Sequence, residues 1–297
     1  MTGAEKGFLL LTSQLGNPDR KVLTVPQMRI LGQRVRQMIV DDPDRQLCRE
    51  DLRALGYSDD MAQRIVALLS ETEVLTYYLR QGEKRDCLCL SRISSGYPAA
   101  LRQKLGDDSP GCLWAKGDLS LMALPKISLV GSRELNEDNR IFAAEVGRQA
   151  ALQGYVLVSG NARGADKTAQ DACLKAGGKV ISVVADRLEA HGTKPNMLYV
   201  SEDGFDCDFS AQRAISRNRV IHALGEKTFV AQCGYQHGGT WDGTVKNLRH
   251  GWSAVYCFRD GSPAQKLLVD MGATCAHMPQ LADLAGLDNL DQGFFDQ

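Results

Sequence analysis

Long apolar runs and a surplus of one charge are both missing from this chain of 297 residues. The short apolar patch from Phe8 to Leu11 is far below what a signal peptide or a membrane helix requires. The first 118 residues carry 17 basic and 16 acidic side chains, and the remainder carries 18 and 20. This balance excludes a strongly basic nucleic-acid-binding domain, so any anion site must be local. We expect a soluble, cytoplasmic protein without a membrane partner.

Recognisable metal and cofactor motifs are missing as well. Among the nine cysteines only Cys87 and Cys89 lie close together, which excludes a zinc finger and fits reduced thiols in a cytosol. The five histidines show no HExxH spacing. The chain contains neither a P-loop nor the spacing of a G-x-G-x-x-G fingerprint. We therefore expect neither a metal site nor a cofactor.

The first 86 residues show helical spacing and almost no strand signal, which predicts a small all-helical domain. Thr24 is expected to cap one helix that has Pro26 in its first turn. Gly56 can end a second helix and Ser58 can cap a third, giving a helix, tight turn, helix unit. This unit is either a nucleic-acid or partner-binding module or a helical cap on the main domain. The second interpretation is favoured because such hairpins are common in α proteins.

Residues 87–125 are interpreted as a lead-in linker with turn-forming residues and one strand. From residue 126 to residue 297, short β-rich runs alternate with helical segments. Examples of the β-rich runs are 127–130, 156–158 and 180–184. Alternation of this kind predicts an α/β fold with a doubly wound parallel sheet.

Two of the β-rich runs end abruptly in glycine, serine and arginine. Residues 126–133 read KISLVGSR, and residues 155–166 read YVLVSGNARGAD. In a parallel sheet such runs are buried strands, and glycine at their carboxyl ends lets the backbone approach a ligand. Exposed backbone N–H groups, the following helix N-terminus and a bidentate arginine all suit phosphate. The sequence therefore predicts a phosphate-binding site where the two turns meet.

The order of ISLVGSR, YVLVSGNARGAD, KVISVVA, SRNRVIHALGE and a late glycine-threonine turn resembles the DprA/Smf family of DNA-processing proteins. The resemblance spans most of residues 95–260 and implies an extended Rossmann-like domain. It also implies a pocket for single-stranded DNA, in proteins that act in natural transformation, protect incoming strands and help to load the recombinase RecA. Members of the family commonly pair through this domain, so the resemblance implies a homodimer.

Mapped onto this chain, the resemblance implies three phosphate-binding elements and a late turn. The residues are Gly131, Ser132, Arg133, Ser159, Gly160, Arg163, Gly164, Arg217, Asn218, Arg219, Gly239 and Thr240. Arginines at 217 and 219, at the start of a helix, are expected to reach successive phosphates, with Asn218 as a neutral donor and acceptor.

Three further residues are assigned supporting roles: Asp166, Lys167 and Trp241. An acid beside a phosphate site repels the ligand, so Asp166 is interpreted as a cap or as an orienting partner for an arginine. Trp241 is either a platform that stacks on a base or a packing anchor.

Several positions depart from the family pattern. Asn161 stands where another glycine is usual, but asparagine tolerates left-handed backbone, so the turn should survive. The late turn reads HGGTWDGT at 237–244 instead of a Ser-Gly-Ser type. The C-terminal winged helix that many members append is also expected to be absent.

A second hypothesis comes from the nucleotide-handling relatives of the same superfamily, including LOG-type phosphoribohydrolases. Those enzymes need an arginine and a glutamate near a Pro-Gly-Gly-x-Gly-Thr-x-x-Glu turn. The late turn here has neither that proline nor that glutamate, and Asp242 is the only acid nearby. We therefore expect a non-enzymatic protein without catalytic residues, with a nucleotide-binding sensor or a LOG-like hydrolase as the alternative.

Overall fold

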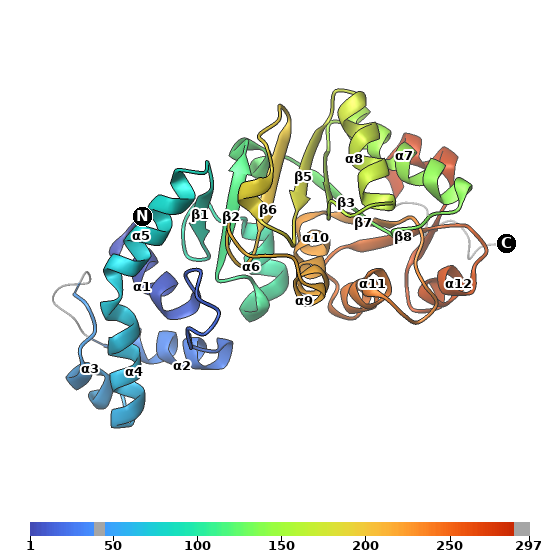
Figure 1. Ribbon diagram of the computed structural model, residues 1–297. Helices are drawn as coiled ribbons and strands as arrows, with labels where there is room; N and C mark the ends of the chain where they lie inside the picture. The colour runs from blue at the N-terminus through green and yellow to red at the C-terminus, as the bar shows by residue number, and fades with distance from the viewer. Residues whose placement is uncertain (39–44, 288–297) are drawn as a thin grey trace.

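The computed structural model describes residues 1–38 and 45–287, so the last ten residues assigned to the second domain lie outside the described residues. A group of helices lies at one end of the molecule, beside a large twisted sheet that is covered by helices on both faces (Figure 1). The N-terminal helices are α1 (Gly3–Thr12), α2 (Val25–Val35), α3 (Arg49–Ala54), α4 (Asp59–Ser70) and α5 (Thr72–Glu83). Within the described ranges, no helix is long and apolar enough to cross a bilayer.

Local capping explains where the N-terminal helices begin. The Thr24 hydroxyl accepts a hydrogen bond from the backbone N–H of Gln27, which confirms the predicted cap of α2. Ser58 caps α4 in the same way, through the N–H of Met61. Gly56 follows α3 with a φ of +82° and so lets the chain leave that helix in a left-handed turn.

A nine-stranded sheet forms the second part, with the spatial order β1-β2-β6-β5-β4-β3-β7-β8-β9. The strands are β1 (Leu88–Ser91), β2 (Cys112–Gly117), β3 (Lys126–Val130), β4 (Val156–Ser159), β5 (Lys179–Val183), β6 (Met197–Ser201), β7 (Lys227–Val230), β8 (Ala254–Phe258) and β9 (Thr274–Ala276). Strands β3 to β9 pair in parallel, whereas β2 pairs antiparallel with both β1 and β6. This arrangement confirms the predicted α/β Rossmann-like sheet with an N-terminal helical part.

The segment interpreted as a lead-in linker belongs to the sheet. Residues 87–125 supply both β1 and β2, where the sequence predicted one strand. Strand β1 was missed because it is a four-residue strand at the end of the sheet whose residues are mostly not buried. Such a strand shows little of the apolar run that marks a buried one.

Helices cover the two faces of the sheet. The helices of this part are α6 (Ala99–Leu105), α7 (Glu137–Leu152), α8 (Ala165–Lys175), α9 (Ala211–Ser216), α10 (Asn218–Leu224), α11 (Gly239–His250) and α12 (Pro263–Asp270). Short 3₁₀ turns are η1 (Gly106–Asp108), η2 (Leu119–Ala123), η3 (Leu188–Ala190) and η4 (Met278–Ala282). Helices α7 and α8 lie on one face, and α9 to α12 lie on the other (Figure 1).

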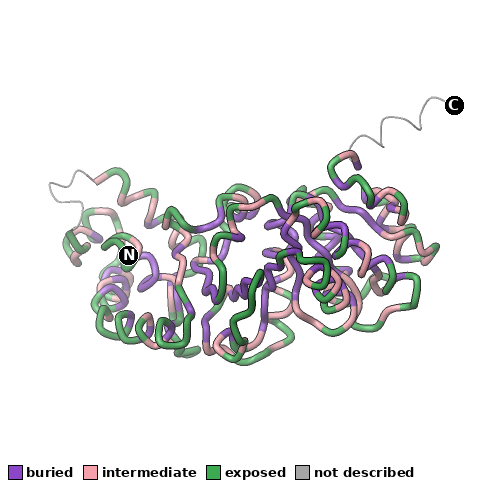
Figure 2. The backbone as a smooth tube through the Cα atoms, turned by 90° about the horizontal axis from the view of Figure 1, so that it is seen from above, coloured by how far each residue is buried: buried purple, intermediate pink, exposed green. Residues whose placement is uncertain are grey.

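Each face has its own core, and buried segments run through the middle of the molecule (Figure 2). Leu157 of β4 packs into the core under α7 and α8, whereas its neighbours Val156 and Val158 pack into the core of the other face. Strand β3 lies between β4 and β7. The chain leaves β3 toward α7 and leaves β7 toward α11 on the opposite face, so a crevice forms at their carboxyl ends.

Candidate phosphate-binding site

The turn after β3 places Ser132 and Arg133 at the carboxyl edge of the sheet. The N–H of Ser132 donates to the carbonyl of Gln232, which follows β7, at 2.9 Å. The Ser132 hydroxyl donates to the same carbonyl at 3.2 Å. Arg133 is exposed, and its guanidinium makes no hydrogen bond or ion pair with any residue that the structure describes. It is therefore a donor without a protein acceptor.

The turn after β4 needs glycine at two positions. A Cβ at Gly160 would collide with the guanidinium of Arg217, which donates to the Gly160 carbonyl at 3.0 Å. Gly164 has a φ of +88°, and a Cβ there would collide with the carbonyls of Ser132 and Arg133. Asn161 adopts the left-handed conformation expected of it, with a φ of +60°. The two turns are therefore packed directly against each other.

Arg217 and Asp166 form a buried pair beneath these turns. The Arg217 Nη2 atom lies 3.9 Å from Asp166 Oδ2, and the two side chains are 9% and 7% exposed. Burial raises the pKa of Asp166 and lowers the pKa of Arg217, because each charge is removed from water. Asp166 also accepts a hydrogen bond from the N–H of Ala162 at 3.1 Å. Asp166 therefore orients the turn and the arginine from a mostly buried position.

Two helices begin at the site without a side-chain cap. Gly164 is the N-cap of α8 and Gly238 is the N-cap of α11, and neither end receives a side-chain hydrogen bond. At α8 the N–H of Ala165 already donates to the Ser132 carbonyl at 3.1 Å, whereas the start of α11 lines the second cavity. Unsatisfied N–H groups at a helix N-terminus and the helix dipole together favour an anion there. Asn218 donates to the carbonyl of Gly239 at 2.9 Å and so ties the start of α10 to the start of α11.

Two adjoining cavities lie above these elements, with volumes of about 330 and 360 Å³. Both are lined by Arg133, Ala162, Ala214 and Arg217, so these residues lie between them. The cavity nearer β5, here called the first cavity, is also lined by Gly160, Asn161, Arg163, Ala185, Asp186 and Phe209. The second cavity is also lined by Gly131, Ser132, Asp166, Asn218, Gly239 and Thr240, among others.

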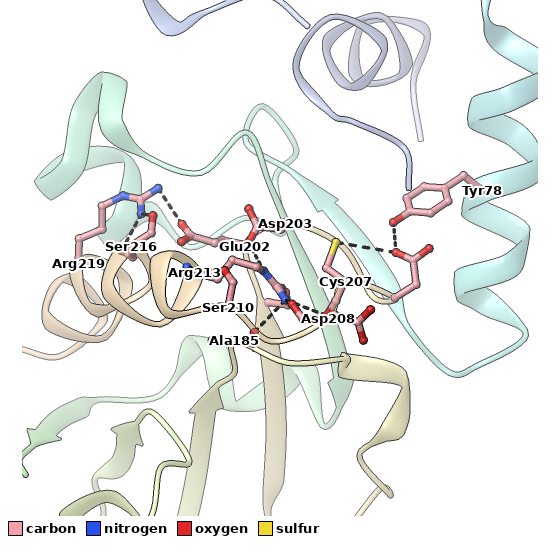
Figure 3. Close-up of polar contacts among 12 residues, drawn as sticks. Tyr78, Ala185, Glu202, Asp203, Cys207, Asp208, Ser210, Arg213, Ser216 and Arg219 are labelled. Atoms are coloured by element: carbon pink, nitrogen blue, oxygen red, sulfur yellow. Dashed lines mark hydrogen bonds and ion pairs between the residues drawn. The ribbon is translucent and has the colours of Figure 1, made fainter. Parts of the chain in front are cut away.

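Arg219 was predicted to bind phosphate, but it lines neither cavity. Its Nη2 atom lies 2.7 Å from Glu202 Oε2, and Nη1 donates to the Ser216 hydroxyl (Figure 3). Its Nε donates to the carbonyl of Asp108 at 3.0 Å. A helix rotates by about 100° per residue, so side chains two positions apart point to roughly opposite sides. Arg217 faces the cavities, and Arg219 consequently faces away.

Four other predicted residues also lie outside the cavities. The Ser159 side chain is fully buried and accepts a hydrogen bond from Gln170 at 2.6 Å. Lys167 pairs with Asp171 at 2.8 Å on the exposed side of α8. Trp241 is 8% exposed and packs in the core beside α10, so it is a packing anchor rather than a stacking platform. Gly164 lines neither cavity and packs against the backbone of Ser132 and Arg133.

Arg163 lines the first cavity, but it lies at the rim. Its side chain is 76% exposed and pairs with the still more exposed Glu134 at 3.1 Å. An exposed pair of this kind is weak and can exchange for a phosphate.

Sequence reasoning missed Asp186 and Phe209, which both line the first cavity. Asp186 follows β5 closely, so the rule that ligands bind at strand carboxyl ends would have included it. The Asp186 Oδ1 atom lies 2.9 Å from His191 Nε2, and this hydrogen bond lowers the pKa of Asp186. Phe209 lies in an irregular loop before α9 and had no sequence signal of its own.

The family model described as DNA recombination-mediator protein A matches residues 89–250, which is more than half of the chain. The DNA processing protein DprA of Streptococcus pneumoniae is 32% identical over 141 residues, covering 44% of this chain and 50% of that protein. DprA of Bacillus subtilis is 28% identical over 196 residues, covering 62% of this chain and 63% of that protein. The matches thus span about half to two thirds of these curated relatives.

Solved structures show the same fold. The structure of DprA from Streptococcus pneumoniae superposes with a TM-score of 0.69 at 22% identity, covering 95% of this chain and 96% of that one. DprA from Helicobacter pylori superposes with a TM-score of 0.56 at 20% identity, covering 69% of this chain and 96% of that one. From the family match and these relatives, we conclude that the chain belongs to the DprA/Smf family, the DNA recombination-mediator protein A family.

Proposed function

We propose that this chain binds single-stranded DNA through its phosphates and acts as a DNA-processing protein without catalytic chemistry of its own. The observation that carries the proposal is the convergence of two glycine-rich turns, Arg133, Arg217 and the uncapped N-terminus of α11 around adjoining cavities. Backbone N–H groups, guanidinium groups and helix N-termini all favour phosphate oxygens.

Relatives support DNA as the source of these phosphates. The solved structure of DprA from Helicobacter pylori concerns how that protein binds single-stranded DNA. The matched family is that of a DNA recombination mediator. Contacts to phosphate carry no sequence information, so the binding should depend little on base sequence. It should instead depend strongly on salt, because each neutralised phosphate releases counterions.

Titration of oligonucleotides of increasing length and of free mononucleotides, at two salt concentrations, tests the proposal. We expect affinity to rise with length and to fall with salt by about 0.7 log unit per log unit of salt for each phosphate neutralised. The nucleotide-sensor hypothesis predicts tight binding of a mononucleotide and little effect of length. That result, or release of a free base from the nucleotide, would overturn the proposal.

The family resemblance also supports three finer proposals: a homodimer, delivery of the bound strand to a RecA-type recombinase, and a role in natural transformation. Light scattering at several concentrations tests the dimer. Recombinase-dependent strand exchange, measured with and without this protein, tests the delivery step. No stimulation of strand exchange by a DNA-binding preparation would contradict the second proposal and leave DNA binding intact.

A further inference from the structure

The first cavity contains a group that phosphate binding does not explain. Asp186 lines this cavity together with Arg133, Arg163 and Arg217, and its side chain is 51% exposed. A carboxylate at the mouth of a phosphate site repels the ligand and weakens binding. Unlike Asp166, it is not buried beneath an arginine. Its position therefore points to a ligand group other than phosphate.

Among the described residues, only one oxygen of the Asp186 carboxylate is hydrogen-bonded to another residue. Oδ1 is held at 2.9 Å by His191 Nε2, and the His191 ring stacks on Tyr199 with 4.6 Å between ring centroids. The His191 side chain is 16% exposed, so the hydrogen bond is sheltered and fixes the carboxylate. Oδ2 has no hydrogen bond to another residue within the described part of the chain. An ionised carboxylate only accepts hydrogen bonds, so Oδ2 is an acceptor for a donor on the ligand.

Phe209 contributes an aromatic surface to the same cavity. It lies between β6 and α9 and is 56% exposed. Bases stack on exposed aromatic rings in single-stranded nucleic-acid sites, and stacking depends little on base identity. Phosphate donors, a hydrogen-bond acceptor and an aromatic face are together the complement of one nucleotide.

Arg213 links the two loops that carry Asp186 and Phe209. Its Nη1 atom donates to the carbonyls of Ala185, Cys207 and Asp208 at 2.8, 2.7 and 2.6 Å (Figure 3). Ala185 directly precedes Asp186, and Asp208 directly precedes Phe209. The Arg213 side chain is 14% exposed, and its Nε atom also pairs with Asp203 at 2.6 Å. One mostly buried guanidinium therefore joins the loop after β5 to the loop before α9.

We propose that the first cavity is a nucleoside subsite. In this subsite Asp186 accepts a hydrogen bond from a sugar hydroxyl or a base amino group, and Phe209 stacks on the base. The inference rests on the proposed function, since the phosphate of the same nucleotide lies between Arg133 and Arg217. It adds a neutral hydrogen-bond donor to what the site recognises. The sugar hydroxyl and the base amino group are both neutral hydrogen-bond donors, and the oligonucleotides used in the test distinguish them.

Removing the Asp186 carboxylate tests the proposal, because repulsion and hydrogen bonding predict opposite changes in DNA affinity. Asp186→Ala removes a carboxylate that lines the first cavity, and Glu134→Ala removes the carboxylate that pairs with Arg163 of the same cavity. Glu134 is the matched control, because among the described residues Arg163 is its one ion-pair partner. If both acids merely repel DNA, both variants bind it more tightly. We expect Glu134→Ala to bind as tightly as the parent or more tightly, and Asp186→Ala to bind roughly ten-fold more weakly. Asp186→Asn, which keeps an acceptor oxygen, should restore part of the loss.

Four short strands identify the donor in fluorescence titrations. Ribo- and deoxyribo-oligonucleotides of one sequence differ in the 2′-hydroxyl, and oligodeoxycytidylate and oligothymidylate differ in the base amino group. The proposal is supported if the parent protein binds the hydroxyl-bearing or the amino-bearing strand more tightly and Asp186→Ala loses this preference. Absence of any preference, or tighter binding by Asp186→Ala, overturns it. Weaker binding by Arg133→Ala in the same assay shows that the phosphate site stands independently of this result.

Discussion

The guanidinium of Arg133 lies between the two cavities, and it has no acceptor among the residues that the structure describes. Arg217 is already engaged with the Gly160 carbonyl and with Asn218. Because the Arg133 guanidinium has no acceptor among the described residues before DNA binds, its contact with phosphate replaces no hydrogen bond within the protein. At the scale of single residues, we therefore expect Arg133 to contribute most to affinity.

Replacing Arg133 with alanine should weaken single-stranded DNA binding by about ten-fold at low salt. The salt slope should fall by about 0.7 because one phosphate contact is lost. Fluorescence titration at three salt concentrations measures both quantities. Arg148→Ala, which removes an exposed arginine of α7 that pairs with Glu145, is the control and should change neither. An unchanged slope in Arg133→Ala would remove this residue from the site.

His222 gives the protein a defined pH dependence. It is fully buried, its Nδ1 atom lies 3.1 Å from Asn247 Nδ2, and burial lowers its pKa from 6.5 to about 3. The unfolded chain therefore binds a proton at a higher pH than the folded chain does. The stability that His222 contributes is present above pH 6.5 and is lost as the pH falls toward about 3. We expect the free energy of unfolding in urea to fall over this window, and to fall less steeply in His222→Gln. Parallel pH profiles would contradict this assignment.

At the scale of the elements, the start of α8 depends on one glycine. Gly164 combines a φ of +88° with backbone carbonyls on the side where a Cβ would lie. Gly154 has a φ of +78° but has nothing within 4 Å of that position, so it is a matched comparison. The helix α8 can therefore pack against the turn after β3 only if residue 164 lacks a side chain.

Gly154→Ala should cost about 1 kcal/mol, since it adds only the left-handed backbone penalty. Gly164→Ala should cost more than about 3 kcal/mol, because two loops must also move apart. Urea unfolding gives both values. Equal costs would show that the turn relaxes without strain.

At the scale of the whole molecule, α5 joins the helical part to the sheet. The Tyr78 hydroxyl donates to Asp206 at 2.6 Å, and its ring packs against Trp114 and Phe205 with centroids 5.3 and 4.9 Å apart. Burial raises the pKa of Tyr78, so the hydroxyl keeps its proton. The apolar residues of the N-terminal helices belong to the same core as the face of the sheet covered by α7 and α8. This packing supports the interpretation of the helical part as a cap on the sheet.

Tyr78→Phe keeps the ring and loses one hydrogen bond to a charged group, so it should cost about 1.5–3 kcal/mol. Tyr78→Ala should cost about 3–5 kcal/mol, because it also leaves a cavity between the two parts. Unfolding followed by tryptophan fluorescence and by circular dichroism checks the costs and the cooperativity. Equal costs for the two variants would mean that the ring contributes nothing to the junction.

The sequence alone determined the features that depend on neighbouring residues. The caps Thr24 and Ser58, the left-handed Asn161 and the strands that end in glycine-rich turns are local, because backbone propensity and apolar spacing operate over a few residues. The parallel sheet followed from the alternation of strands and helices.

Only the tertiary structure decided which side chains face the ligand. Arg217 lies at the cavities while Arg219 pairs with Glu202, and Trp241 enters the core while Phe209 stays exposed. Asp186 and Phe209 line one cavity, and Arg213 joins the two loops that carry them. These outcomes depend on helix rotation and on contacts between segments far apart in the chain, and short-range sequence patterns contain neither.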